Sequence, residues 1–134
     1  MALTASAILL TLFLAEAQAQ AAEPAMLDLS CDGTKKEESG TAGPIRKMRL
    51  SLNFTEKTIS GFGLVAQIDS LTDATITFSV HAPRDGGTTS VIGYVNRVTG
   101  AVWATSVREA DNEIIGTETY DLSCKITDRL IPAP

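Results

Sequence analysis

The stretch "YDLSC" at residues 120–124 nearly repeats "LDLSC" at residues 27–31, close to the opposite end of the chain. In both stretches apolar residues alternate with polar ones, which is the period of a half-buried β-strand. This alternation places Cys31 and Cys124 on the apolar faces of their strands. They are the only two cysteines of the chain, and such an even pair in a small domain is compatible with a disulfide. Because a disulfide requires close backbones, the first and last strands are expected to be neighbours.

The same two-residue period continues between the cysteines. It is clearest in "KMRLSLNF" (47–54) and "ATITFSVH" (74–81), and turn residues separate such stretches. A long segment rich in Gly, Lys and Glu, residues 32–44, is expected to be a mobile loop. The pattern predicts strands at about 26–31, 45–54, 57–62, 64–69, 74–81, 88–96, 101–108 and 117–126.

The predicted fold is therefore all-β, an antiparallel meander of about eight short strands with one disulfide. A meander whose ends meet is a closed or nearly closed barrel, which also removes exposed strand edges. The alternative is a two-sheet β-sandwich with the disulfide across its layers. In a barrel we expect Leu, Ile, Val and Phe to fill the interior and to leave little room for a large ligand.

The N-terminal residues lack the alternating pattern of the rest of the chain. An uncharged apolar run precedes Glu16, and overlapping A-x-A sites follow it. This indicates a secretory signal peptide at residues 1–21, cleaved after Ala19 or Ala21, followed by a single exported β-domain at residues 22–134. The apolar run is too short for a membrane-spanning helix. We therefore expect a periplasmic or secreted protein that does not span a membrane after processing.

Composition narrows the possible chemistry. The formal net charge of −5 argues against nucleic acid as a partner, because phosphates require a clustered basic face. His81 is the only histidine, so with both cysteines oxidised no zinc site, and more generally no cofactor, is expected. Asp28 and Asp121 occupy matching places on strands that should be neighbours and could in principle pair for glycoside hydrolysis. Both alternate outward, so a solvated face is the expected interpretation, and a hydrolase with an unrecognised site stays an alternative. Otherwise the sequence predicts a non-enzymatic monomer.

Four residues are candidates for surface recognition. Arg84 and Asp85 lie in a predicted turn, and Tyr94 and Trp103 lie in "GYVNRVTGAVW" (93–103). The polar centre of that stretch predicts a hairpin turn, with Asn96 bonding to the backbone ahead and Gly100 adopting a positive φ. One strand phase exposes Tyr94, and the opposite phase buries it. The small number of aromatic residues favours burial.

Several pieces of the chain together resemble a known group of proteins. They are "LSCDGT", "LNFTEKTISGFG", "IGYVNRVTGAVWATS" and "TYDLSCK", which follow one another after the predicted signal peptide. In this order they are similar to uncharacterised small exported proteins of rhizobia and related alphaproteobacteria. The resemblance implies export, a paired cysteine and a Gram-negative bacterial source, and it transfers no catalytic residue.

The function expected from these observations is an exported, non-enzymatic domain that binds a protein or an envelope component. A first alternative is an inhibitor of a cell-wall hydrolase such as lysozyme, because small periplasmic lysozyme inhibitors are also disulfide-bearing β-barrels. The second alternative is the hydrolase mentioned above.

Overall fold

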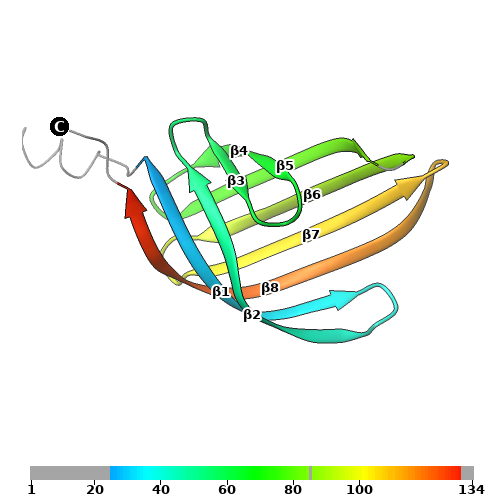
Figure 1. Cartoon of the computed structure of the whole chain (residues 1–134), viewed down its shortest axis with the longest axis horizontal. Coiled ribbons are helices and arrows are strands. Elements are labelled where there is room, and N and C mark those ends of the chain that lie inside the picture. The colour runs from blue at the N-terminus through cyan, green and yellow to red at the C-terminus, as the bar shows by residue number, and fades with distance from the viewer. Residues whose placement is uncertain (1–24, 85, 131–134) are drawn as a thin grey trace, which may run out of the picture.

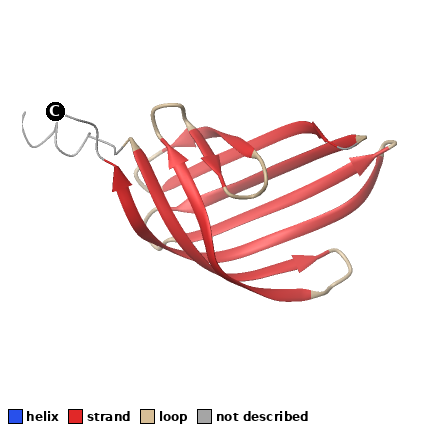
Figure 2. Cartoon of the chain, viewed as in Figure 1, coloured by secondary structure: helices blue, strands red, loops and turns tan. Residues whose placement is uncertain are grey.

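The chain forms a closed antiparallel barrel in which each strand pairs with the next and the last strand pairs with the first. The computed structural model describes residues 25–84 and 86–130, so the predicted signal peptide at 1–21 lies outside the described residues. Figures 1 and 2 show the strands and the loops that join them. The described residues include no helix long and apolar enough to cross a membrane. The strands are β1 (Met26–Glu37), β2 (Ala42–Asn53), β3 (Thr58–Ser60), β4 (Val65–Leu71), β5 (Thr75–Arg84), β6 (Gly87–Asn96), β7 (Ala101–Ala110) and β8 (Glu113–Leu130).

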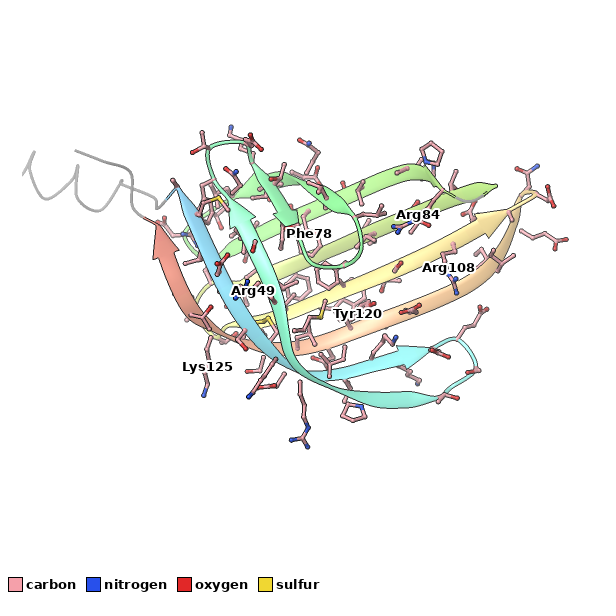
Figure 3. All side chains as sticks on the ribbon, viewed as in Figure 1. Arg49, Phe78, Arg84, Arg108, Tyr120 and Lys125 are labelled. Atoms are coloured by element: carbon pink, nitrogen blue, oxygen red, sulfur yellow. A yellow bond between two sulfur atoms is a disulfide. The ribbon has the colours of Figure 1, made fainter. Side chains whose placement is uncertain are left out.

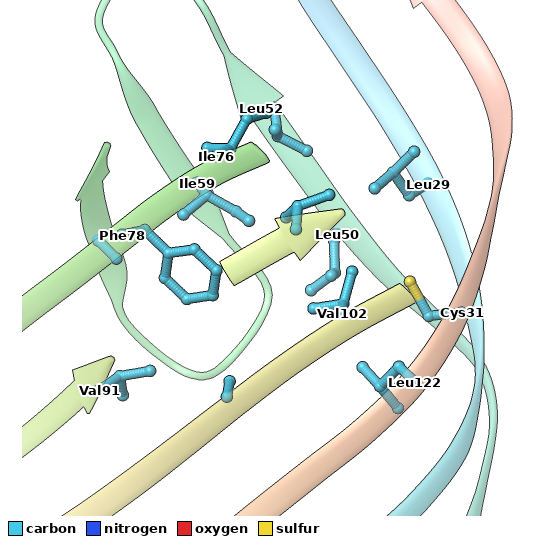
Figure 4. Packing of buried hydrophobic residues seen from close by; sticks show 13 residues of the cluster. Leu29, Cys31, Leu50, Leu52, Ile59, Ile76, Phe78, Val91, Val102 and Leu122 are labelled. Carbon is cyan, nitrogen blue, oxygen red and sulfur yellow. The ribbon is translucent and has the colours of Figure 1, made fainter. Parts of the chain in front are cut away.

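This architecture confirms the predicted barrel, and the β-sandwich alternative is not adopted. The predicted alternation explains the core, since Leu50 and Leu52 on β2 and Ile76 and Phe78 on β5 are almost fully buried. Each such side chain contributes about 1.5–3 kcal/mol of burial free energy. Figure 4 shows these side chains converging with Leu29, Ile59, Val102 and Leu122 in the barrel interior.

The two ends of the barrel differ. One end holds the apolar core and the turns that follow β2, β4 and β6, and we call it the apolar end. The other end holds the turns that follow β1, β5 and β7, and we call it the polar end. β3 and β4 are short and do not extend to the polar end, so β2 and β5 separate there (Figure 1). A loop at residues 61–64, between β3 and β4, lies beside this gap.

The gap leaves two strand edges without a partner strand among the described residues, residues 42–50 of β2 and 80–84 of β5. Such edges invite pairing with other chains, and proline and backbone irregularities discourage it. β2 carries Pro44 and Lys47, whose φ of 54° interrupts a regular strand. β5 carries Pro83. Both edges therefore contain features that oppose aggregation.

The mobile loop predicted for residues 32–44 is wrong. β1 continues to Glu37 and β2 begins at Ala42, so most of this segment is a regular hairpin. β8 also pairs with it, from Gly33 opposite Leu122 to Glu37 opposite Glu118. The apolar alternation is missing because the inward positions here face the polar end of the barrel. Lys35, for example, forms an ion pair with Glu118 instead of joining the core.

The turn between β6 and β7 agrees with the sequence. The Asn96 side-chain oxygen accepts hydrogen bonds from the backbone N–H groups of Val98 (2.9 Å) and Thr99 (3.0 Å). Gly100 has a φ of 82°, a conformation that glycine adopts without steric cost. Its N–H donates to the carbonyl oxygen of Asn96 at 2.9 Å. The polar centre of "GYVNRVTGAVW" is thus a turn.

Candidate functional site

The two cysteines form the expected disulfide. Cys31 on β1 and Cys124 on β8 are register partners with a Cα–Cα distance of 4.1 Å. The bond therefore links the first and last strands at the seam where the barrel closes. Cys31 is fully buried and Cys124 partly buried, as their apolar phase predicted.

Tyr94 and Trp103 lie on the outer face of the barrel, so the burial that the sequence favoured for Tyr94 is wrong. They are register partners on β6 and β7, and their rings stack with centroids 6.0 Å apart and planes inclined by 24°. Tyr94 is 43% exposed, and Ile92 on the same face is 54% exposed. We call Ile92, Tyr94 and Trp103 the aromatic patch.

Polar residues continue the row that the two rings occupy. Tyr94 pairs in register with Thr77 on β5, and Trp103 pairs with Asp121 on β8. Asp121 is exposed, and the Thr77 hydroxyl is 2.7 Å from that of Ser70. The strands thus place a hydroxyl, two aromatic rings and a carboxylate side by side on a rigid wall.

Arg84 and Asp85 do not belong to this face. Arg84 follows the inward phase of β5, and its Nη1–H donates to the Gly63 carbonyl oxygen at 2.8 Å. It therefore ties the end of β5 to the loop at residues 61–64. Asp85 lies outside the described residues.

The polar end contains a cavity of about 370 Å³, which the sequence did not predict. Figure 3 shows Arg84, Arg108 and Tyr120 in this half of the barrel, on β5, β7 and β8. The inward phase of the strands supplies most of the lining, and Phe62 reaches it from the loop at residues 61–64. The cavity is lined by Phe62, Arg84, Gly87, Thr88, Thr89, Ser106, Arg108, Glu109, Ala110, Ile115, Glu118 and Tyr120.

Aromatic side chains separate this cavity from the apolar core. Phe78 of the core stacks on Phe62, with ring centroids 5.7 Å apart. Phe62 in turn meets Tyr120 edge to face at 5.1 Å. The expectation of an interior filled by apolar side chains is thus confirmed only at the apolar end.

Tyr120 has an altered acidity because of its position in this wall. Partial burial, followed by the charge of Glu118 and the hydrogen bond to it, raises the pKa of Tyr120 to about 12 from an ordinary value of 10.0. The hydroxyl donates to Glu118 Oε2 at 3.1 Å. All three causes oppose ionisation, because each disfavours a phenolate at this place.

We expect this pKa shift to appear in the pH dependence of stability. The folded state holds the Tyr120 proton more tightly than the unfolded state does. Its stabilising contribution is therefore complete below pH 10 and is lost as the pH rises from 10.0 towards about 12. Allowing for solvent screening of a half-exposed group, we expect an alkaline loss of about 1 kcal/mol.

Tyr120→Phe removes this contribution, so its unfolding free energy should fall less steeply with pH than that of the wild type. Urea unfolding at a series of alkaline pH values measures the difference, and Tyr94→Phe is the control. Parallel curves for the wild type and Tyr120→Phe would contradict the assignment.

Other sequence candidates are not brought together. Asp28 lies opposite residue 128 and Asp121 lies opposite Thr34, so these two carboxylates do not form a pair. Asp28 instead accepts a hydrogen bond from Ser51 at 2.8 Å. The ring of His81 is hydrogen-bonded to the Ser90 hydroxyl on the outer face. Across residues 25–84 and 86–130, no group of three or more His, Cys, Asp or Glu side chains is placed to hold a metal ion.

Sequence reasoning missed Arg108, Glu118 and Tyr120 as members of one site. One signal was present, because counting inward positions from the buried Val102 and Ala104 places Ser106 and Arg108 on the inner face of β7. Comparison with protein-family models, curated proteins and solved structures gives no match for this chain.

Proposed function

We propose that the protein is an exported, non-enzymatic binding domain that recognises a glycan of the cell envelope through the aromatic patch. The observation that carries the proposal is the row Thr77, Tyr94, Trp103 and Asp121 across four neighbouring strands. Contiguous exposed apolar surface on a small soluble domain is often an interaction site. Tyr and Trp are also the residues that most often dominate binding energies.

The chemistry of the row favours a sugar. A pyranose ring has an apolar C–H face that packs against aromatic rings, whose faces carry partial negative charge. Its hydroxyl groups lie at the edge of the ring, where a carboxylate can accept strong hydrogen bonds. Asp121 lies beside Trp103, and Thr77 lies beside Tyr94 at the other end of the row. The spacing of neighbouring strands allows one extended glycan to contact several of these side chains.

Export is supported by the predicted signal peptide and by the disulfide, because disulfides persist in oxidising compartments. A flat aromatic face on a disulfide-closed barrel suits a domain that works outside the cytoplasm. Stability there is aided by the bond between the first and last strands.

Trp103 is the only tryptophan of the chain, so tryptophan fluorescence reports directly on the aromatic patch. We expect soluble N-acetylglucosamine oligomers or peptidoglycan fragments to change this emission in a saturable way. The protein should also co-sediment with purified cell-wall sacculi. Tyr94→Ala should weaken both signals by about tenfold, since it removes one of the two rings.

The matched control is Val65→Ala, because Val65 is an apolar residue on β4 that is 60% exposed and lies outside the patch. It should bind as the wild type does. Trp103→Ala, followed by calorimetry instead of fluorescence, should lose binding. Emission that does not respond to any of these glycans, together with no co-sedimentation, would refute the proposed function.

A further inference from the structure

The cavity at the polar end is a second candidate binding site. It lies inside the barrel, whereas the aromatic patch lies on the outer face. Its volume of about 370 Å³ lies at the lower end of the range for pockets that hold small organic molecules. An eight-stranded barrel has room for one such ligand where side chains do not fill it. A ligand in this cavity would bind independently of a glycan on the aromatic patch.

Arg108 is the group that defines the chemistry of this cavity. Its register partner on β8 is Gly116, and the guanidinium packs over that glycine. A Cβ atom added at Gly116 would lie only 2.6 Å from Arg108 Nη2. Because Gly116 has no side chain, the space beside it is free for the guanidinium of Arg108. Among the residues that the structure describes, Arg108 has no hydrogen-bond or ion-pair partner for its side chain.

Glu118, the acid of β8 that lines the cavity, already has two partners. Glu118 Oε2 is 3.4 Å from Lys35 Nζ and accepts the hydrogen bond of the Tyr120 hydroxyl. Arg84 of β5 also lines the cavity. Its Nη1–H donates to the Gly63 carbonyl oxygen, and its other guanidinium N–H groups remain available to a ligand. Glu109 is exposed and also borders the cavity. Two guanidinium groups, one of them unpaired, thus face the same space.

The rest of the wall is suited to an apolar body. Phe62 and Tyr120 form an edge-to-face aromatic pair, and Ile115, which borders the same cavity, is 60% exposed. Thr89 adds a hydroxyl group, and only 9% of this residue is exposed. A flat ring placed against Phe62 would remove this apolar surface from water.

We propose that the polar end of the barrel binds a small organic anion that joins a carboxylate or sulfonate group to a flat apolar body. The anionic group pairs with the guanidinium of Arg108, whose fork of N–H donors matches a carboxylate in two parallel hydrogen bonds. The apolar body lies against Phe62 and Tyr120. Arg84 adds positive charge from β5, which is separated from β7 by β6 alone.

The first experiment uses anilinonaphthalene sulfonate as the probe, since it combines a sulfonate with aromatic rings and fluoresces when it leaves water. We expect saturable binding to the full exported domain, weakened by about tenfold or more in Arg108→Gln, because a hydrogen-bonded charge is lost. Naphthoate should displace the probe, whereas the neutral naphthamide should not. Added salt should weaken binding to the wild type more than binding to Arg108→Gln.

Arg49→Gln is the matched control, because Arg49 is exposed on β2 and does not border the cavity. It should bind the probe as the wild type does. Arg108→Lys keeps the charge without the fork and should fall between the wild type and Arg108→Gln. Equal affinity of Arg108→Gln and the wild type would overturn the proposal. Displacement of the probe by naphthamide as effectively as by naphthoate would also overturn it. Loss of probe binding in Trp103→Ala with normal binding in Arg108→Gln would do the same, because it would place the probe on the aromatic patch.

Discussion

Replacing both cysteines with alanine is expected to lower the free energy of unfolding by about 4 kcal/mol. Cys31 and Cys124 are separated by 93 positions in the sequence, so the bond closes a loop that contains most of the described chain. In the chain-entropy account, such a bond restricts the unfolded ensemble far more than the folded barrel. Thermal unfolding followed by circular dichroism should show a midpoint lower by about 15 °C.

Ser30→Ala with Ser123→Ala is the matched control, because these residues directly precede the two cysteines on the same strands. Neither serine is fully buried, so we expect only a small change in stability. A reducing agent should bring the wild type to the midpoint of the cysteine variant and leave that variant unchanged. A cysteine variant as stable as the wild type would show that the pairing of β1 with β8 alone holds the seam.

The second large effect is expected at Gly93 on β6. An ideal Cβ at this position would lie 2.6 Å from Phe78 Cζ and 3.0 Å from the Cα of Ala104, and closer still to the carbonyl oxygen of Trp103. These neighbours belong to the strands on both sides, so no flexible side chain alone can make room. We expect Gly93→Ala to destabilise the protein by about 3 kcal/mol, measured by urea unfolding.

Gly43→Ala provides the control, since nothing lies within 4 Å of a Cβ added at that glycine. It should be close to neutral in the same assay. Because Phe78 stacks on Phe62, Gly93→Ala should also disturb the wall of the polar cavity and weaken probe binding there. Equal unfolding free energies for Gly93→Ala and Gly43→Ala would show that the close packing of Phe78 against β6 does not require glycine at position 93.

Gly93 also explains why the sequence could predict the strand but not its outward face. A two-residue period defines two faces, and it does not say which face is inside when both carry large residues. Ile92 and Tyr94 occupy one face, and Val91, Gly93 and Val95 the other. A glycine within a strand often marks a close approach, and here Phe78, its register partner on β5, fills the space. With Gly93 on the inner face, the two-residue period puts Tyr94 on the outer face.

The barrel itself was predictable because the near-copies around Cys31 and Cys124 combine strand phase with a covalent neighbour. The polar cavity was not predictable in the same way. Lys35, Arg108 and Glu118 follow the inward phase of their strands, so they interrupt the apolar pattern on which strand prediction depends. Lys35 fell in the loop predicted for residues 32–44, and Arg108 and Glu118 fell near the ends of predicted strands. Only the three-dimensional pairing shows that they share one interior.

The pairing of the first strand with the last has a consequence for the connectivity of the chain. Met26 and Leu130 are register partners, so the two ends of the barrel sequence meet at one edge of the seam. A short linker between them would make the chain circular without altering any ladder. New termini could then be opened at the exposed turn of residues 38–41. The fold thus admits circular permutation, and a fusion partner could be attached next to the polar cavity instead of at the natural ends.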